Sequence, residues 1–284
     1  MQYGVHLSLI DFAGYGFAFG ALTSFARTAR DLGFDALAAN DHLAFQRPWL
    51  DGLIALASVA EASGDLRLAT TVALPVVRGA AALAKAAAAL DIVSGGRLAL
   101  GVGPGSSARD YELAGVPFDE RWPRFDAAVQ ALRSYLSPPE PLLPAPRNLP
   151  IWVASWGSAA GLRRVARLGD GWLASGYNAT PAQVAAGRAA LASLGRPDLP
   201  CTLATVWTYI TDDGSAALAR LAGMLNRPAD QLADKVLIGP ALGCAAILRA
   251  YAEAGVDHVF IWPLAEPERQ LELFMQDVVP AVAG

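Results

Sequence analysis

The sequence contains 284 residues, of which 54% are hydrophobic and 17% are charged, against a usual charged share of roughly 25%. A chain of this length and composition can bury a large core without disulfides or a structural metal, which excludes a disordered chain. The formal net charge is −4 and the only lysines are Lys85 and Lys235, so the sequence lacks the basic stripe that nucleic-acid binding needs. We expect one domain over residues 1–284.

The sequence also argues against export and membrane insertion. The first positively charged side chain is Arg27, so no charged region precedes an apolar segment at the amino terminus. The longest uncharged stretches, 12–26 and 171–187, are interrupted by polar residues, glycine or proline. We therefore expect a cytoplasmic protein, with a homodimer as a further expectation from its low charge. Cys201 and Cys244 lack nearby ligand residues, which predicts two small buried thiols and no metal site.

Eight short apolar runs that favour β-structure follow one another along the chain. They begin near Tyr3, Phe34, Leu66, Arg97, Pro150, Gly171, Thr202 and Asp257. Their apolar residues are continuous rather than alternating, as in parallel strands that are covered on both faces. The first four runs begin 31 or 32 residues apart. This spacing indicates a repeated strand–helix unit.

Alanine-rich segments with helical spacing lie between these runs and predict helices over 22–32, 53–62, 125–136 and 159–168. Eight strand–helix units in a chain of this length match a closed α/β barrel of the (β/α)8 TIM type. The main alternative is an open doubly wound sheet, but no glycine-rich fingerprint follows the first strand. The proline-dense stretch 137–150 is interpreted as an extended connection within one domain.

Glycine follows the last helical turn at three similar junctions, at Gly33, Gly169 and Gly255. We expect these glycines to end their helices in a left-handed backbone conformation, which glycine adopts without steric cost.

Polar residues follow the second predicted strand at Asn40, Asp41 and His42. Histidine is well suited to proton transfer near neutral pH, and a neighbouring carboxylate can orient it. Asp41 and His42 are therefore candidate catalytic residues. The alternative is a structural carboxylate at Asp41 that caps the loop, with His42 packed beside it.

The third predicted strand ends at Thr70 and Thr71, and Arg78 follows shortly after. The two hydroxyl groups could line the barrel mouth and Arg78 could bind an anion through its guanidinium group. The alternative is that the threonines simply suit a strand and that Arg78 is solvated.

Small residues also follow the fourth and fifth predicted strands. Gly101, Gly103 and Gly105 would let the backbone approach a planar or anionic ligand. Ser158 begins a helix whose free amides favour phosphate, although a helix cap is the commoner role for such a serine.

Several aromatic residues lie in or beside connections at strand ends and could form the wall of a pocket or simply fill the core. They are Trp49, Trp122, Trp156, Trp207 and Trp262. His6 and His258 lie within strands without the spacing of metal ligands, and we interpret both as structural.

The stretch from Leu90 to Leu136 resembles the bacterial luciferase-like monooxygenase superfamily, in particular its single-chain F420-dependent oxidoreductases. The pattern consists of LD, SGGR, GVG, a GVPF-like turn and ER, followed by a helix. The NDH triplet at 40–42, Arg78 and the segment 150–172 extend the likeness over nearly the whole chain. The resemblance implies a (β/α)8 barrel with a flavin or F420 in its mouth.

The resemblance also implies roles for single residues. Asp41 and His42 would lie by the reactive part of the ring, and a cis peptide between Thr71 and Val72 would support its back face. Gly103, Gly105 and Ser106 would approach the ring and its side chain. The phosphate would be bound by Gly157, Ser158 and Gly176. The implied cofactor-binding residues are Asp41, Thr71, Val72, Gly103, Gly105, Ser106, Gly157, Ser158 and Gly176.

Two positions depart from the family pattern. Ser106 stands where many F420 enzymes of this group have an acidic residue, and Arg78 is followed by Gly79 instead of the usual histidine. The sequence predicts hydride transfer between F420 and a small organic substrate, with a proton supplied through His42 or an ordered water. The close alternative is an FMN-dependent monooxygenase. A second alternative is a non-catalytic barrel that serves as a partner subunit or cofactor carrier.

Overall fold

The structure is a computed structural model that describes residues 1–12, 14, 16–137, 142–146 and 148–283. Its strands are β1 (Gln2–His6), β2 (Ala36–Ala39), β3 (Arg67–Thr70), β4 (Leu98–Val102), β5 (Ile151–Ala154), β6 (Gly171–Ser175), β7 (Cys201–Ile210), β8 (Leu237–Gly239) and β9 (His258–Pro263). Neighbouring strands from β1 to β7 pair in parallel, and β9 pairs with both β7 and β1. Eight strands of the described chain therefore close into the predicted barrel.

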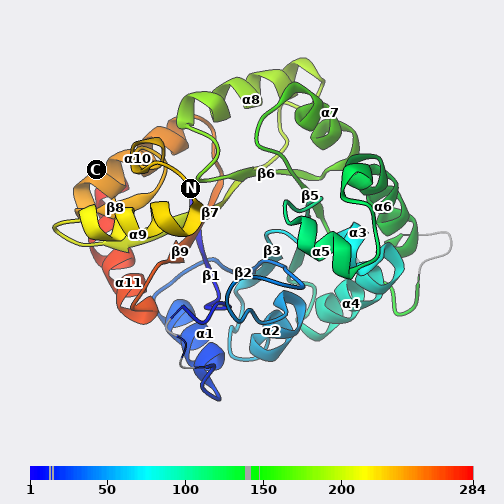
Figure 1. Cartoon of the computed structure of the whole chain (residues 1–284), viewed down its shortest axis with the longest axis horizontal. Coiled ribbons are helices and arrows are strands. Elements are labelled where there is room, and N and C mark those ends of the chain that lie inside the picture. The colour runs from blue at the N-terminus through cyan, green and yellow to red at the C-terminus, as the bar shows by residue number, and fades with distance from the viewer. Residues whose placement is uncertain (13, 15, 138–141, 147, 284) are drawn as a thin grey trace.

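The helices form a ring around these strands (Figure 1). They are α1 (Ala21–Asp31), α2 (Gly52–Val59), α3 (Pro75–Arg78), α4 (Ala80–Val93), α5 (Ala108–Leu113), α6 (Arg121–Leu136), α7 (Ala159–Leu168), α8 (Pro181–Ser193), α9 (Ser215–Leu225), α10 (Ala241–Glu253), α11 (Pro267–Leu273) and α12 (Val279–Ala283). The four predicted helices correspond to α1, α2, α6 and α7. The predicted proline-rich connection lies partly outside the described residues, because 138–141 and 147 are not among them.

The sequence interpretation missed β8, a strand of three residues. It pairs with the last three residues of β7, Thr208 to Ile210, and takes no part in the ring. A run this short carries too little periodicity to be recognised.

Glycines end two of the predicted junctions as expected, with φ angles of 84° at Gly33 and 88° at Gly255. The prediction for Gly169 is wrong, because this residue has an extended backbone with φ −101°. A glycine is needed at this position because a side chain has no room: a Cβ would lie 2.9 Å from the carbonyl oxygen of Gly171 and 3.0 Å from that of Val165.

The barrel interior is filled by side chains from several strands. A separate buried cluster contains Ala36, Ala38, Ala69, Ala99, Trp152, Leu173, Ala204 and Phe260. The two large rings fit because a glycine faces each of them: a Cβ on Gly4 would overlap the Phe260 ring, and one on Gly171 would lie 2.5 Å from Trp152. The centre is therefore a packed core, as in other barrels of this type, and side chains available for chemistry lie at the strand ends.

Candidate active site

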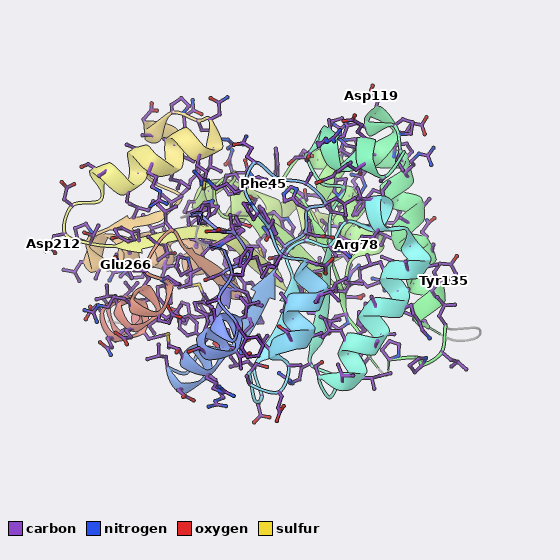
Figure 2. The ribbon with its side chains drawn as sticks, turned by 60° about the horizontal axis from the view of Figure 1, so that its bottom comes forward. Phe45, Arg78, Asp119, Tyr135, Asp212 and Glu266 are labelled. Carbon is purple, nitrogen blue, oxygen red and sulfur yellow. The ribbon has the colours of Figure 1, made fainter. Side chains whose placement is uncertain are left out.

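An ionic network joins the loop after β2 to α3. The Arg78 guanidinium donates to both carboxylate oxygens of Asp41, at 2.5 and 2.6 Å, and to Asp51 at 2.5 Å. The backbone N–H of Leu74 also donates to Asp41, whose side chain is only 5% exposed. Arg78 is therefore neither solvated nor free to bind an anion. In Figure 2 Arg78 lies toward the middle of the view, whereas Asp119 and Asp212 lie at its edges.

The electrostatics of this network follow from its pairing. The hydrogen bond with Asp41 is the main cause that raises the pKa of Arg78. Burial alone would raise the pKa of Asp51, but hydrogen bonds from the Ile54 backbone and from Arg78 outweigh burial and lower it. Asp51 also caps α2, because its side chain accepts from the Ile54 N–H. These three charges hold the β2–α2 loop against α3.

His42 pairs with a residue that the sequence interpretation did not single out. Its Nδ1 lies 2.7 Å from Oδ2 of Asp110, a buried residue in the first turn of α5. The other oxygen of Asp110 accepts from the backbone N–H groups of Leu43 and Ala44, each at 3.0 Å. Asp41 and His42 thus belong to two separate interactions. The only sequence signal for Asp110 was an acidic residue that follows the helix cap Ser107.

The structure confirms the expected cis peptide between Thr71 and Val72. Gly103 faces this peptide, since a Cβ on Gly103 would lie 2.9 Å from Cγ2 of Val72. A Cβ on Gly101 would overlap the carbonyl oxygen of Thr70, and Gly105 has a φ of 78°. Two of these glycines therefore let β3 and β4 approach closely. Ser106 is exposed at the start of the following connection.

The residues expected to receive a phosphate lie after β5 and β6. Ser158 caps α7, because its side chain accepts from the backbone N–H of Gly161. Gly157 has a φ of 95°, and a Cβ on Gly176 would lie 2.6 Å from Val206. The first N–H groups of α7 have no partner within the helix, and such groups favour anions. Both roles proposed for Ser158, cap and anion site, remain compatible.

An aromatic stack lies at the barrel mouth on β1, β7 and β9. The His6 ring stacks on Trp262 with a centroid distance of 4.4 Å, and Trp207 stacks on Trp262 at 4.5 Å. We call these three residues the aromatic stack. Trp49 contacts the edge of Trp262 at 5.9 Å and the His42 ring at 4.7 Å.

The remaining aromatic candidates lie elsewhere. Trp122 and Trp156 are 42% and 59% exposed, and Trp122 packs beneath the Arg164 guanidinium. His258 contacts the edge of Trp152 at 6.2 Å near the amino end of the barrel. This placement agrees with a structural role for His258.

Four buried side-chain polar atoms of the described residues lack a hydrogen-bond partner: His6 Nδ1, Asn40 Oδ1, Trp49 Nε1 and Trp207 Nε1. His6 ends β1, Asn40 follows β2, Trp49 lies in the next loop, and Trp207 pairs with Trp262 near the end of β9. An unpaired buried polar group costs about 1–3 kcal/mol. Because they share a place at the carboxyl ends of the strands, where barrels of this type bind their ligands, we take this end of the barrel as the candidate site.

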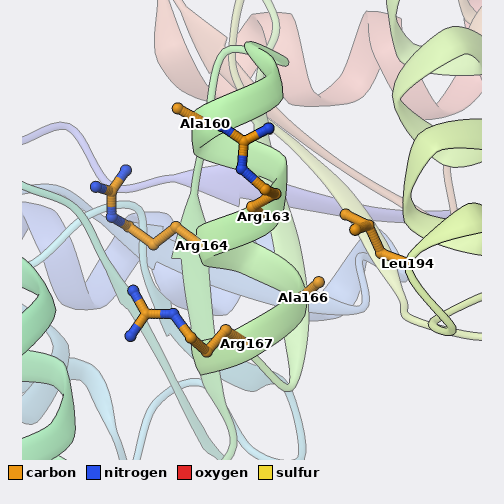
Figure 3. Close-up of a pocket in the computed structure, with 6 residues that line it drawn as sticks. All are labelled: Ala160, Arg163, Arg164, Ala166, Arg167 and Leu194. Carbon is orange, nitrogen blue, oxygen red and sulfur yellow. The ribbon is translucent and has the colours of Figure 1, made fainter.

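An open depression of ≈ 520 Å³ lies away from this site, on the outer face of α7 (Figure 3). It is lined by Arg163, Arg164 and Arg167, together with Leu194 and two alanines. Arg164 and Arg167 both pair with Asp126, which offsets much of their charge. We assign it no part in the chemistry at the strand ends.

The described part of the chain contains no group of three or more His, Cys, Asp or Glu that could hold a metal. None of its helices is both long enough and apolar enough to span a bilayer. Cys201 and Cys244 are buried free thiols, as predicted.

A family model described as luciferase-like monooxygenase matches residues 5–229. Among curated proteins, the uncharacterized Rv0940c of Mycobacterium tuberculosis is 33% identical over 144 residues, which cover 46% of this chain and 49% of that protein. The chain thus matches about half the length of its first curated relatives.

Other relatives match over nearly the full chain. The F420-dependent glucose-6-phosphate dehydrogenase of Kineococcus radiotolerans is 27% identical, with 93% of each chain covered. Among solved structures, an F420-dependent secondary alcohol dehydrogenase in complex with an F420–acetone adduct has a TM-score of 0.85 and 18% identity, with 99% of this chain and 98% of that chain covered. The structural likeness confirms the barrel fold.

Proposed function

The chain belongs to the luciferase-like monooxygenase family, and we propose that it is an oxidoreductase that transfers a hydride between the deazaflavin F420 and a small organic substrate. One observation of the structure carries this proposal: the four unpartnered buried polar atoms all lie at the carboxyl end of the barrel. The relatives named as F420-dependent dehydrogenases support F420 as the cofactor in preference to FMN.

The residues present fit such a cofactor. A deazaflavin or flavin ring carries carbonyl oxygens and a ring N–H, which match the unpaired Trp49 indole N–H and the unpaired Asn40 oxygen. Thr71, Val72 and Gly103 would hold the ring on the β3–β4 side. Gly105 and Ser106 would lie along its side chain. The phosphate-binding residues in this proposal are Gly157, Ser158 and Gly176, beside the first turn of α7.

F420, when bound, supplies the carbon that gives or takes the hydride. His42 handles the accompanying proton in this proposal. Because Asp110 lies against Nδ1, it fixes that nitrogen as the protonated one and leaves the Nε2 lone pair to accept a proton. This arrangement supplies a proton-transfer group where Ser106 offers no carboxylate.

Asp41 takes a supporting role, as in the structural alternative stated for it above. Both of its oxygens are engaged by Arg78, and one of them also by the Leu74 N–H. Both oxygens are thus occupied by groups of the protein itself and are not free to contact a ligand. Asp41 instead fixes the loop that carries His42.

Cofactor binding is the first experiment. The purified chain is titrated separately with F420, FMN and riboflavin, and fluorescence quenching of each cofactor is followed. We expect saturable binding of F420. Binding of FMN but not of F420, with a lower affinity for riboflavin because it lacks the phosphate, would support the monooxygenase alternative. Binding of none of the three compounds would contradict the proposal.

Asp110→Asn tests the role assigned to His42. The variant keeps the side-chain shape but removes the charge that orients the imidazole, so we expect turnover with F420 to fall about ten- to a hundredfold. F420 affinity should stay unchanged. The exposed residue Asp119 provides the matched control, because Asp119→Asn should leave turnover as it is. The carrier alternative would be favoured if the chain binds F420 but turns over no tested substrate, and if His42→Ala leaves the F420 affinity unchanged.

A further inference from the structure

His6 is the last residue of β1 and faces the barrel interior. Its neighbours Val5 and Leu7 belong to the main core, whereas the His6 ring contacts Phe260 and Trp262 of β9. The side chain is 1% exposed. It therefore lies inside the mouth of the barrel, at the level where the strands end.

The backbone of β7 is distorted next to this ring. The pairing of β7 with β9 shifts register between Leu203 and Val206, and Thr205 between them has a φ of 61°. This left-handed conformation is uncommon for a β-branched residue. The distortion directs the Thr205 backbone N–H at Nε2 of His6, with an N···N distance of 3.2 Å. Bulges of this kind often re-aim groups beside active sites.

This hydrogen bond fixes the state of the imidazole. A nitrogen that accepts a hydrogen bond carries no proton, so in the neutral ring the proton is on Nδ1. Burial lowers the pKa of His6 to about 3, which keeps the ring neutral at physiological pH. The Nδ1–H group is buried and has no partner.

We propose that His6 is a fixed neutral hydrogen-bond donor that binds a carbonyl or hydroxyl oxygen of the substrate. Its hydrogen-bonding and ring neighbours are Thr71, Thr205, Phe260 and Trp262, which are all uncharged. An uncharged donor in uncharged surroundings suits a neutral oxygen better than a carboxylate or phosphate.

The neighbours of His6 narrow the substrate class further. Trp207 adds a second buried, unpaired N–H within the stack, and the stacked rings make the surroundings of both donors apolar. The class is thus an apolar ketone or the corresponding alcohol. This inference rests on the proposed function, because His6 lies beside Thr71, one of the residues proposed to hold the F420 ring, with His6 Nε2 3.5 Å from the Thr71 hydroxyl oxygen.

The test compares ketones with alkenes of the same shape, which lack the oxygen. The pairs are cyclohexanone with methylenecyclohexane and acetophenone with α-methylstyrene. Dissociation constants are measured by ligand-observed NMR for the chain alone and with F420 bound. We expect at least one ketone to bind about tenfold more tightly than its alkene, and His6→Phe to abolish this preference.

His258→Phe is the matched control, since this second strand histidine lies near the amino end of the barrel and should leave the preference intact. Equal binding of ketone and alkene for both pairs in the native chain, or a preference that survives in His6→Phe, would overturn the inference. Failure of F420 binding with an intact ketone preference would contradict only the proposed function.

A second measurement does not depend on the variants. In 15N-labelled native protein, the imidazole nitrogens of His6 should show protonated Nδ1, and its signal should shift with the ketone but not with the alkene. An Nδ1–H that stays bonded to a retained water in the presence of either ketone would overturn the inference.

Discussion

The two sides of the barrel mouth differ in how they use their polar groups. In the ionic network of Asp41, Asp51 and Arg78, the charged groups bind one another and the backbone. In the aromatic stack, His6 and Trp207 keep N–H groups without partners. The ionic network is completed by the protein itself, and the aromatic stack is left for a ligand to complete. Substitutions on the first side should therefore act mainly on stability, and those on the second mainly on binding.

The largest effect is expected from Arg78→Met. It leaves the Asp41 carboxylate buried without its counter-charge, which should lower the free energy of unfolding by about 3–5 kcal/mol. Urea denaturation measures this loss. The control is Arg109→Met, which removes an exposed pair with Glu112 and should cost well under 1 kcal/mol. A loss below 1 kcal/mol for Arg78→Met would remove the contrast between the two sides.

Gly101→Ala tests the close approach of β3 and β4 on the same side. The new Cβ would overlap the Thr70 carbonyl oxygen, so the strands must separate, at a cost of about 2–3 kcal/mol. Gly223 of α9 is the matched control, because it has open space around it and Gly223→Ala should stabilise the helix by up to about 1 kcal/mol. Equal melting temperatures for the two variants would contradict the close packing.

The pH dependence of stability probes the aromatic side. The pKa of His6 is lowered to about 3 in the folded chain, whereas a histidine in the unfolded chain has a pKa of about 6.5. As the pH falls below about 6.5, the unfolded chain binds a proton at His6 that the folded chain does not bind, so the free energy of unfolding decreases. Between pH 7 and pH 5 the native chain should lose about 2 kcal/mol more than His6→Phe. Parallel curves for the two chains would show that His6 titrates normally and is not enclosed by the stack.

Ser158→Ala gives the smallest effect and lies outside both sides. Loss of the α7 cap should lower the free energy of unfolding by about 1 kcal/mol. Ser193→Ala, in the exposed last turn of α8, should change it by less than 0.5 kcal/mol, within roughly the range of ordinary surface substitutions. If Ser158→Ala changes neither stability nor F420 affinity, neither of its two assigned roles holds.

The sequence was sufficient to predict the barrel because parallel strands and helices leave periodic apolar patterns. It also placed Thr71, Val72 and the glycines near strand ends. Partnerships across long separations left no such signal: His42 and Asp110 are 68 residues apart, and their pairing depends on how α5 packs. The sequence likewise predicted only a structural role for His6. The distortion at Thr205 depends on how β7 pairs with β9, and such pairing leaves no local signal in the sequence.

The connection from β7 to β9 bears on how this scaffold could be altered. β7 is longer than the part of it that pairs with β6. Its last three residues pair with β8, which lies outside the ring of eight strands. Residues 211–257, which include α9, β8 and α10, therefore attach to the barrel without closing it. Exchange of the part that precedes β8 for a loop of different length should leave ring closure intact. This segment is thus the natural place to graft new recognition elements during enzyme engineering.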